Sequence, residues 1–268
     1  MFALVHKILY RALPLEGYLR VVSRLFFLCH RLGIGRRSAA LEYVYHLPQL
    51  VGKGSVCIDI GANLGYYART LARLTGPSGR VYAVEPVPVI GRVLRRNLRG
   101  YAHAEILPYA LGGENRPVRM ANDTVRTSGY FGTGQNYVDE GGGGSTGGTG
   151  DCETFEAEMR RGSELFASLR RLDFIKCDIE GYELHVLREM RPLVERFRPT
   201  VLVETGGGNR PQVIALFRGL GYEGFTLERG REVPLAPESP KDIIFRPRGG
   251  ERRSEGTGRR ETGEQGDK

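Results

Sequence analysis

The sequence predicts an α/β fold in which a mostly parallel sheet carries helices on both faces. From about residue 50 to residue 247, short apolar segments alternate with longer segments whose apolar residues recur every three or four positions. This alternation is typical of parallel sheets, because each crossover between parallel strands usually contains a helix. Hydrophobic residues make up 40% of the 268 residues, enough for a sizeable core. We therefore predict one domain over residues 50–247.

Seven segments have the pattern of strands. Residues 56–60 form an apolar run that is interrupted by one acid and bounded by glycines, as expected of a strand buried on both faces. The other six predicted strands are short apolar runs, at residues 81–84, 104–107, 173–177, 200–203, 222–227 and 242–245. Four helices are predicted between them from apolar residues three to four positions apart, at residues 64–74, 88–98, 181–191 and 209–220.

The N-terminal segment, residues 1–49, is predicted to be helical. Its apolar residues follow helical periodicity on either side of a break at Pro14, which indicates two helices that pack on the core or cap a pocket. Residues 1–40 also hold seven basic side chains against one acid. Two alternatives therefore stay open for this segment, peripheral contact with an anionic membrane and a dimer interface. The segment has no apolar stretch of about 18 residues and no recognisable signal peptide, so we expect a cytoplasmic protein.

Two further stretches lack periodicity. Residues 121–150 are polar and glycine-rich, and we expect either a solvated insertion or a lid that closes over an acceptor with Tyr130, Phe131 and Tyr137. Residues 248–268 hold no large apolar side chain, which predicts a disordered tail.

The cysteines and histidines argue against metal chemistry and a disulfide scaffold. The four cysteines form no C-x-x-C pair, and the five histidines are scattered without an H-E-x-x-H motif. We therefore predict no metal site and a reducing compartment.

The strongest local motif is DIGANLG, residues 59–65, at a predicted strand-to-helix turn. Gly61 and Gly65 let the backbone turn sharply and approach a ligand closely, and the following helix presents unpaired amides. The pattern is neither G-x-G-x-x-G nor a P-loop. Because Asp59 would repel a pyrophosphate, the turn favours a ligand with positive charge, such as the ammonium and sulfonium of S-adenosylmethionine. A plain tight turn with Asp59 capping the helix is the alternative.

Carboxylates also follow other predicted strands. They stand after the second, fourth and fifth strands, as Glu85, as Asp178 with Glu180, and as Glu204. Because the carboxyl ends of parallel strands share one edge of a sheet, we expect them beside Asp59. Glu85, 20 residues after the glycine turn, is placed to accept the hydroxyls of an adenosine ribose. Glu180 has a structural alternative, in which its charge complements the dipole of the next helix.

Six segments in this order and spacing resemble the FkbM family of methyltransferases, which depend on S-adenosylmethionine: DIGANLGYYA, VYAVEPVP, LRRNL, PYALG, DFIKCDIEGYELHVL and VLVE. The resemblance covers residues 50–247. It implies a class I methyltransferase fold, a Rossmann-like sheet of seven strands with the last one antiparallel. It also implies methylation of oxygen on a sugar, a polyketide-type metabolite or a related small molecule.

The matching motifs imply which residues hold the cofactor. Those expected to line its methionine part are Asp59, Gly61, Asn63 and Gly65. Glu85 is expected to hold the ribose, and Tyr109 and Ala110 to flank the adenine. Asp178 is expected to face the methyl group.

A hydroxyl acceptor must lose its proton, so a general base is expected near the methyl group. Asp178 is the first candidate, Glu204 the second and His185 the third. A magnesium ion held by Asp178, Glu180 and Glu204 is an alternative way to activate the hydroxyl.

Other functions are weighed against this prediction. RNA is an alternative target because the chain is basic, with a net charge of +8, but a carboxylate-lined edge opposes a polyanion and nucleic acid is not expected. A cofactor-binding module without catalysis keeps the same motifs. An NAD-dependent oxidoreductase is disfavoured by the missing G-x-G-x-x-G. The sequence thus favours a small molecule or glycan as acceptor.

Overall fold

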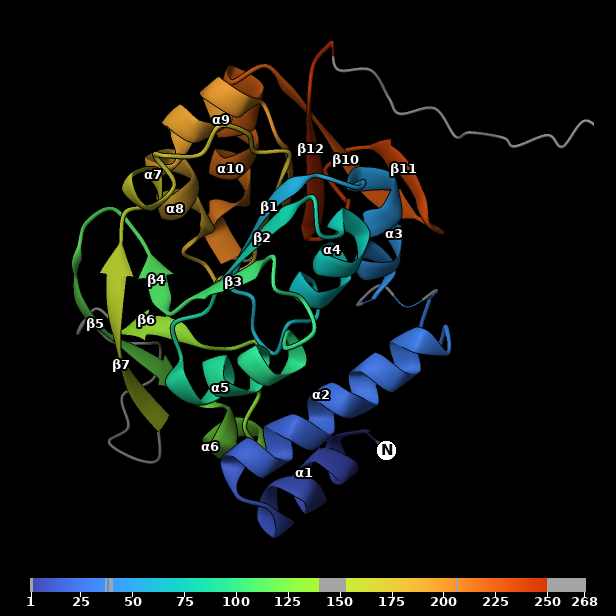
Figure 1. Ribbon diagram of the computed structural model, residues 1–268, viewed down its shortest axis with the longest axis vertical. Helices are drawn as coiled ribbons and strands as arrows, with labels where there is room; N and C mark the ends of the chain where they lie inside the picture. Colours follow the sequence, from blue (N-terminus) through green and yellow to red (C-terminus); the bar gives the residue numbers. More distant parts are fainter. Residues whose placement is uncertain (1, 37, 39–40, 140–152, 206, 250–268) are drawn as a thin grey trace, which may run out of the picture.

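The computed structural model describes residues 2–36, 38, 41–139, 153–205 and 207–249 (Figure 1). Within these residues the chain forms an eight-stranded sheet, a separate four-stranded sheet and a group of N-terminal helices. The last residues of the predicted tail, 250–268, and the glycine run at 141–150 lie outside the described residues.

The large sheet contains all seven predicted strands. Its order is β11-β10-β12-β9-β8-β1-β2-β3. The bounds are β1 (Val56–Ile60), β2 (Arg80–Val84), β3 (Ala104–Leu107), β8 (Phe174–Cys177), β9 (Thr200–Glu204), β10 (Tyr222–Glu228), β11 (Arg231–Pro234) and β12 (Asp242–Pro247). Strand β12 runs antiparallel to both β9 and β10, while β3, β2, β1, β8 and β9 are parallel. All seven predicted strands and the antiparallel direction of the last one are confirmed.

Strand β11 is an eighth strand that the sequence analysis did not predict. It pairs antiparallel with β10 at the edge of the sheet. Arg229 and Gly230, which join the two strands, both have positive φ, at 53° and 78°. Two consecutive residues with positive φ are typical of the tight turn of a β-hairpin.

The strand order reverses between β1 and β8. From β1 the chain builds outward through β2 and β3, then returns to place β8 on the other side of β1. The helices that follow β1 and β8 cover opposite faces of the sheet, so neither fills the space between the carboxyl ends of these two strands. The two strand ends therefore border an open crevice.

Helices cover both faces of the large sheet, as predicted (Figure 1). One face packs against α8 (Glu183–Glu189), α9 (Arg191–Phe197) and α10 (Arg210–Gly219), with α7 (Gly162–Leu165) beside them; the short η1 (Gly207–Asn209) precedes α10. The other face packs against α4 (Ala68–Thr75) and α5 (Pro88–Asn97). Neighbouring residues of β1 point to opposite faces of the sheet. Ile58 belongs to the hydrophobic core on one face and Cys57 to the core on the other, and both are fully buried. A strand buried on both faces reads as a continuous apolar run.

A second sheet stands beside the first. Its order is β4-β7-β5-β6, with bounds β4 (Tyr109–Leu111), β7 (Glu153–Arg160), β5 (Arg116–Asn122) and β6 (Tyr137–Asp139). Helix α6 (Thr124–Ser128) follows β5. Residues 121–139, which the sequence analysis places in a solvated insertion or a lid, contain the end of β5, α6 and β6. The three-residue strands are too short to show an alternating pattern.

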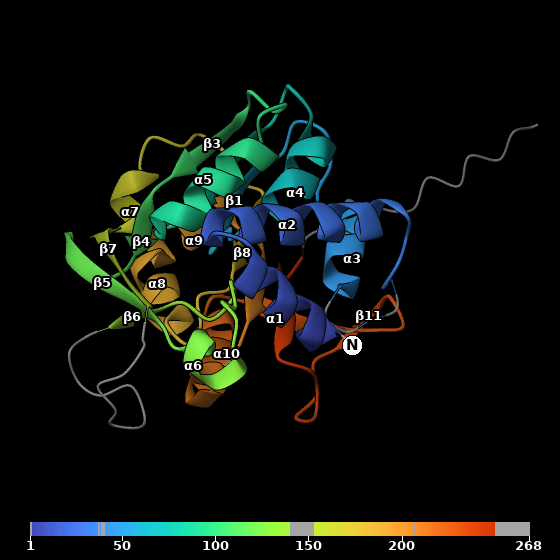
Figure 2. The same ribbon diagram turned by 90° about the horizontal axis from the view of Figure 1, so that it is seen from below.

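The N-terminal segment forms three helices where two were expected: α1 (Phe2–Ala12), α2 (Leu15–Arg31) and α3 (Glu42–Leu50). The break at Pro14 is where it was predicted, at the start of α2. Helix α2 packs across α5, with α1 on its outer side (Figure 2). No helix among the described residues is long and apolar enough to cross a membrane.

Candidate active site

The loop after β1 touches the loop after β8, and this contact explains the glycine at position 61. Gly61 has a φ of +76°, and a Cβ there would lie 2.0 Å from the backbone oxygen of Asp178. The Gly61 and Ala62 amides donate to the Val84 carbonyl, which ties the loop to the end of β2. A side chain at position 61 would separate the two loops that border the crevice.

Replacing Gly61 by alanine should therefore lower the free energy of unfolding by about 1–3 kcal/mol, since it combines a strained φ with a backbone clash. Urea unfolding of the two proteins measures the difference. Gly91→Ala is the matched control, because Gly91 lies inside α5 with open space around it and alanine favours a helix. Equal urea midpoints for Gly61→Ala and the parent would contradict the packing described here.

Glu85, just after β2, is held in place by two backbone amides. Its Oε2 accepts from the Asn63 amide and its Oε1 from the Val87 amide, both at 2.9 Å. Burial raises the pKa of Glu85 to about 7, although the two amide bonds oppose the rise. Each carboxylate oxygen keeps a second lone pair, so the fixed carboxylate can still accept two hydroxyl groups of a ligand.

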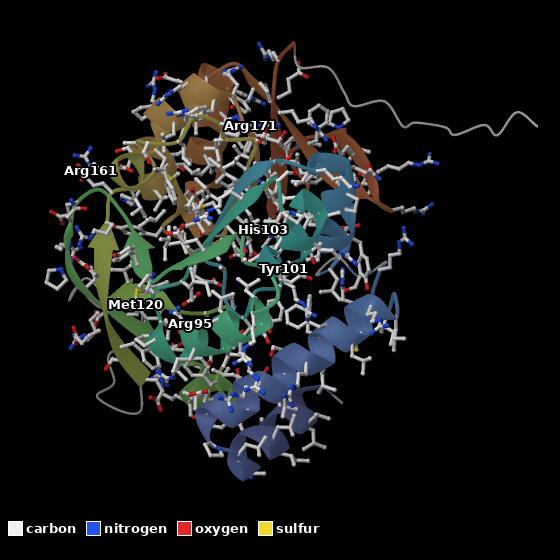
Figure 3. All side chains as sticks on the ribbon, viewed as in Figure 1. Arg95, Tyr101, His103, Met120, Arg161 and Arg171 are labelled. Carbon is white, nitrogen blue, oxygen red and sulfur yellow. The ribbon has the colours of Figure 1, made fainter. Side chains whose placement is uncertain are left out.

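A cleft of about 620 Å³, open solvent included, lies at this edge of the sheet. Six of the predicted site residues line it together, namely Gly61, Asn63, Glu85, Tyr109, Ala110 and Asp178. Residues of the second sheet and its loops complete the wall, including Met120, labelled in Figure 3, Thr133 and Asn136.

The charges on the cleft wall are all of one sign. Glu85, Asp178 and Glu180 line it, while no lysine, arginine or histidine is among its described lining residues. Such a wall opposes a pyrophosphate and fits a ligand that carries positive charge and hydroxyl groups. The ammonium, sulfonium and ribose of S-adenosylmethionine have this chemistry, so the residues present fit that cofactor.

The structure places two predicted cofactor residues behind the wall. Gly65 has a φ of +90°, and a Cβ there would lie 2.9 Å from Leu94 Cδ1, so it allows α5 to approach the turn. Asp59 is fully buried and does not line the cleft. Its pKa is raised to about 6, because burial outweighs the opposing charge of Lys176, and the Asp178 charge raises it further. The Ala68 amide is near, but neither carboxylate oxygen has a partner at hydrogen-bond geometry among the described residues.

Asp178 is paired with a buried lysine. Lys176, 5% exposed in β8, donates to its Oδ2 from Nζ at 2.8 Å, which compensates the cost of burying the ammonium. The same Nζ lies 4.9 Å from the centre of the Tyr67 ring. Lys176 also pairs in register with Asp59 on β1. The lysine thus faces both carboxylates and holds the Asp178 side chain at the crevice.

A second, larger cavity adjoins the cleft, and we call it the chamber. It encloses about 2210 Å³, open solvent included, between α1, α2 and the carboxyl edge of the large sheet. At the sheet edge it is lined by Asp178, Glu204, Lys241 and Asp242. Asp178 and Thr133 line both the cleft and the chamber, so the two cavities meet at these residues.

The carboxylates at the chamber end influence one another. Glu204 forms an ion pair with Lys241, and its pKa is raised by burial and by the Asp178 charge. Burial, with the charges of Glu204 and Asp178, raises the pKa of Asp242 to about 7. Glu180 faces the cleft, and partial burial with the same two charges raises its pKa to about 7. This edge therefore holds groups that exchange protons near neutral pH.

The structure does not bring His185 to this edge of the sheet, and its described residues do not form the magnesium site considered as an alternative. His185 is exposed on α8, stacks on the Tyr182 ring at 4.7 Å between ring centres and lines neither cavity. No three histidine, cysteine, aspartate or glutamate side chains of the described chain converge as a metal site, and this includes the three carboxylates of the magnesium alternative.

Lys241 and Asp242 are site residues that the sequence analysis missed. Lys241 precedes the antiparallel strand β12 and Asp242 is its first residue, so both lie at the edge where the parallel strands end, and Asp242 pairs in register with Glu204. The antiparallel last strand implied by the resemblance was the signal that could have located them.

The strand order, with its antiparallel β12, is that of the class I methyltransferase fold, and the carboxylate-lined cleft fits S-adenosylmethionine. Residues 59–223 match the model of the methyltransferase FkbM domain, and the chain belongs to the FkbM family.

Individual relatives are methyltransferases. Methyltransferase sdnD of Sordaria araneosa is 28% identical over 223 residues, which are 72% of this chain and 82% of that protein. A protein-L-isoaspartate O-methyltransferase of Methanothrix thermoacetophila is 44% identical over 69 residues, which are 25% of this chain and 33% of that one. A solved methyltransferase FkbM from Methylobacillus flagellatus aligns over 72% of this chain at 16% identity, with a TM-score of 0.46. The aligned part is 44% of the solved chain, less than half its length.

Proposed function

We propose that this protein transfers a methyl group from S-adenosylmethionine to a hydroxyl of a small molecule. The observation that carries the proposal is the position of Asp178, which lines both the carboxylate cleft and the adjoining chamber. A donor in one cavity and an acceptor in the other would meet at this side chain. Holding the two reactants in attack geometry supplies most of the catalysis in such a transfer.

The cleft residues have distinct roles in this proposal. When bound, S-adenosylmethionine supplies a methyl carbon that the acceptor oxygen takes, while the sulfur keeps the electron pair of the broken bond. Glu85, fixed by two amides, accepts the ribose hydroxyls. Tyr109 and Ala110 flank the adenine from β4, and the Gly61 and Asn63 turn borders the methionine part. Asp59 contributes negative charge from behind the wall.

The hydroxyl proton passes to a carboxylate that lines the chamber. Asp178 is our first choice because Lys176 holds it in position at 2.8 Å. Glu204 is the second, since it also lines the chamber. A polyanion such as RNA is disfavoured as acceptor by the carboxylates at this edge. We also propose a cytoplasmic location, which the free thiols of Cys29, Cys57 and Cys177 support.

Calorimetry with S-adenosylhomocysteine and, separately, with NAD tests the cofactor assignment. We expect S-adenosylhomocysteine to bind and Glu85→Gln to weaken that binding, because the amide of glutamine offers one acceptor oxygen instead of two. Binding of NAD without binding of S-adenosylhomocysteine would overturn the proposal.

A further inference from the structure

The chamber is apolar over most of its wall. Helices α1 and α2 contribute Val5, Leu9, Val22, Leu25 and Phe26. Outside these two helices and the sheet edge, the described lining of the chamber comes from Tyr66 and Tyr67, from residues 130–133, and from Ile34, Gly35, Ser38, Leu41, Tyr43 and Val44. The charged side chains are confined to the sheet edge, where the chamber meets the cleft. The cavity therefore has one polar end and a large apolar body.

Three polar side chains in the apolar part of the wall, those of His6, Tyr18 and Tyr43, are already paired with the protein. His6 Nδ1 and the Tyr18 hydroxyl are 2.7 Å apart, and that hydroxyl donates to the Phe131 carbonyl at 3.1 Å. The Tyr43 hydroxyl donates to the Asp242 carbonyl at 2.8 Å. A sugar needs a hydrogen-bond partner for nearly every hydroxyl it buries, and these three side chains already use their hydrogen-bonding groups within the protein.

The rim of the chamber is apolar as well. Leu25 is 46% exposed and Ile34 55% exposed, and both also line the chamber. Among the described residues, every large hydrophobic side chain that is strongly exposed falls within residues 4–34. An exposed apolar patch that continues into a cavity is typical of an entrance for an apolar ligand.

We propose that the chamber is the acceptor site, and that the acceptor is a molecule with an extended hydrocarbon body and one hydroxyl group rather than a sugar. This inference rests on the proposed methyl transfer. The hydrocarbon body lies against α1 and α2, which stabilises binding in proportion to the apolar area removed from water. The hydroxyl reaches the polar end, where Asp178 accepts its proton as the methyl group is transferred from the cleft.

Protection of Cys29 from alkylation tests this inference. Cys29 lines the chamber and is partly exposed, whereas Cys57 and Cys177 are fully buried. Cys152, which lies outside the described residues, is replaced by serine to leave one reactive thiol. We expect farnesol at ten times its dissociation constant to slow the reaction of Cys29 with iodoacetamide by about tenfold, by mass action. Rhamnose should not slow it.

The same measurement shows whether the acceptor enters from water or from a membrane surface, when farnesol is offered either free or in phosphatidylglycerol vesicles. Protection of Cys29 in either arm supports the proposal.

Two leucines of α2 provide the matched variants. Leu25 lines the chamber, while Leu28 is similarly exposed, at 53%, and does not line it. Leu25→Glu should abolish the protection by farnesol, and Leu28→Glu should preserve it. Binding of S-adenosylhomocysteine is measured for each protein. If that binding is absent, the proposed function fails; if it is present and rhamnose, but not farnesol, protects Cys29, the methyl transfer stands and the apolar acceptor is wrong.

Discussion

Asp178→Asn should lower kcat by about 10²–10⁴-fold, the usual contribution of a general base. Asparagine keeps the size of the side chain but cannot take a proton from the acceptor hydroxyl. Because Asp178 lines both the cleft and the chamber, its loss affects the point at which donor and acceptor meet. Single-turnover methyl transfer to an identified acceptor measures the effect, and calorimetry with S-adenosylhomocysteine should show that cofactor binding is largely retained.

Glu204→Gln is the discriminating control for this variant. Glu204 lines the chamber but not the cleft, and it is already paired with Lys241. We expect it to lower kcat by less than Asp178→Asn does. The reverse order would assign the base to Glu204, and full activity in both variants would contradict a carboxylate base at this edge.

Lys176→Met should lower the free energy of unfolding by about 3–5 kcal/mol, because it leaves buried charges without their cation. Burial alone would lower the pKa of Lys176, but the charges of Asp178 and Asp59 outweigh it and raise that pKa. Asp59 is fully buried and has no partner at hydrogen-bond geometry among the described residues. Without the lysine, its carboxylate must stay charged in an apolar interior or take up a proton. Urea unfolding at neutral pH measures the loss.

Lys241→Met is the matched control, since it removes a lysine–carboxylate pair whose lysine side chain is 62% exposed. Such pairs contribute about 0–1 kcal/mol. Adding Asp59→Asn to Lys176→Met should restore part of the lost stability by removing the uncompensated charge. If Lys176→Met unfolds at the same urea concentration as Lys241→Met, the buried lysine does not have the role described here.

The main sheet could be predicted because its pattern is local. Neighbouring residues of the five-residue strand β1 enter opposite core clusters, so the run is apolar except for Asp59 and easy to recognise. The carboxylates of the cleft followed from the same reasoning, since all parallel strands end at one edge. Glu85 and Asp178 line one cleft, although 93 positions separate them in the sequence.

The second sheet and the eighth strand could not be predicted in this way. Strands β4 and β6 have three residues each, too few to show an alternating pattern. Strand β5 pairs with β7 across a long intervening segment, and Met120 faces Phe155 in that pairing. Pairings between distant segments depend on side-chain fit that a local pattern does not contain.

The sequence by itself determined the α/β class, the glycine turn at residues 59–65 and the carboxylates at the strand ends, because each depends on neighbouring residues or on the shared direction of parallel strands. Tertiary structure alone decided that Asp59 lies behind the cleft wall, that Asp242 pairs in register with Glu204, and that α1 and α2 enclose an apolar chamber. These features arise where segments distant in the sequence pack together, and their positions follow from the complementarity of whole surfaces rather than from the spacing of residues along the chain.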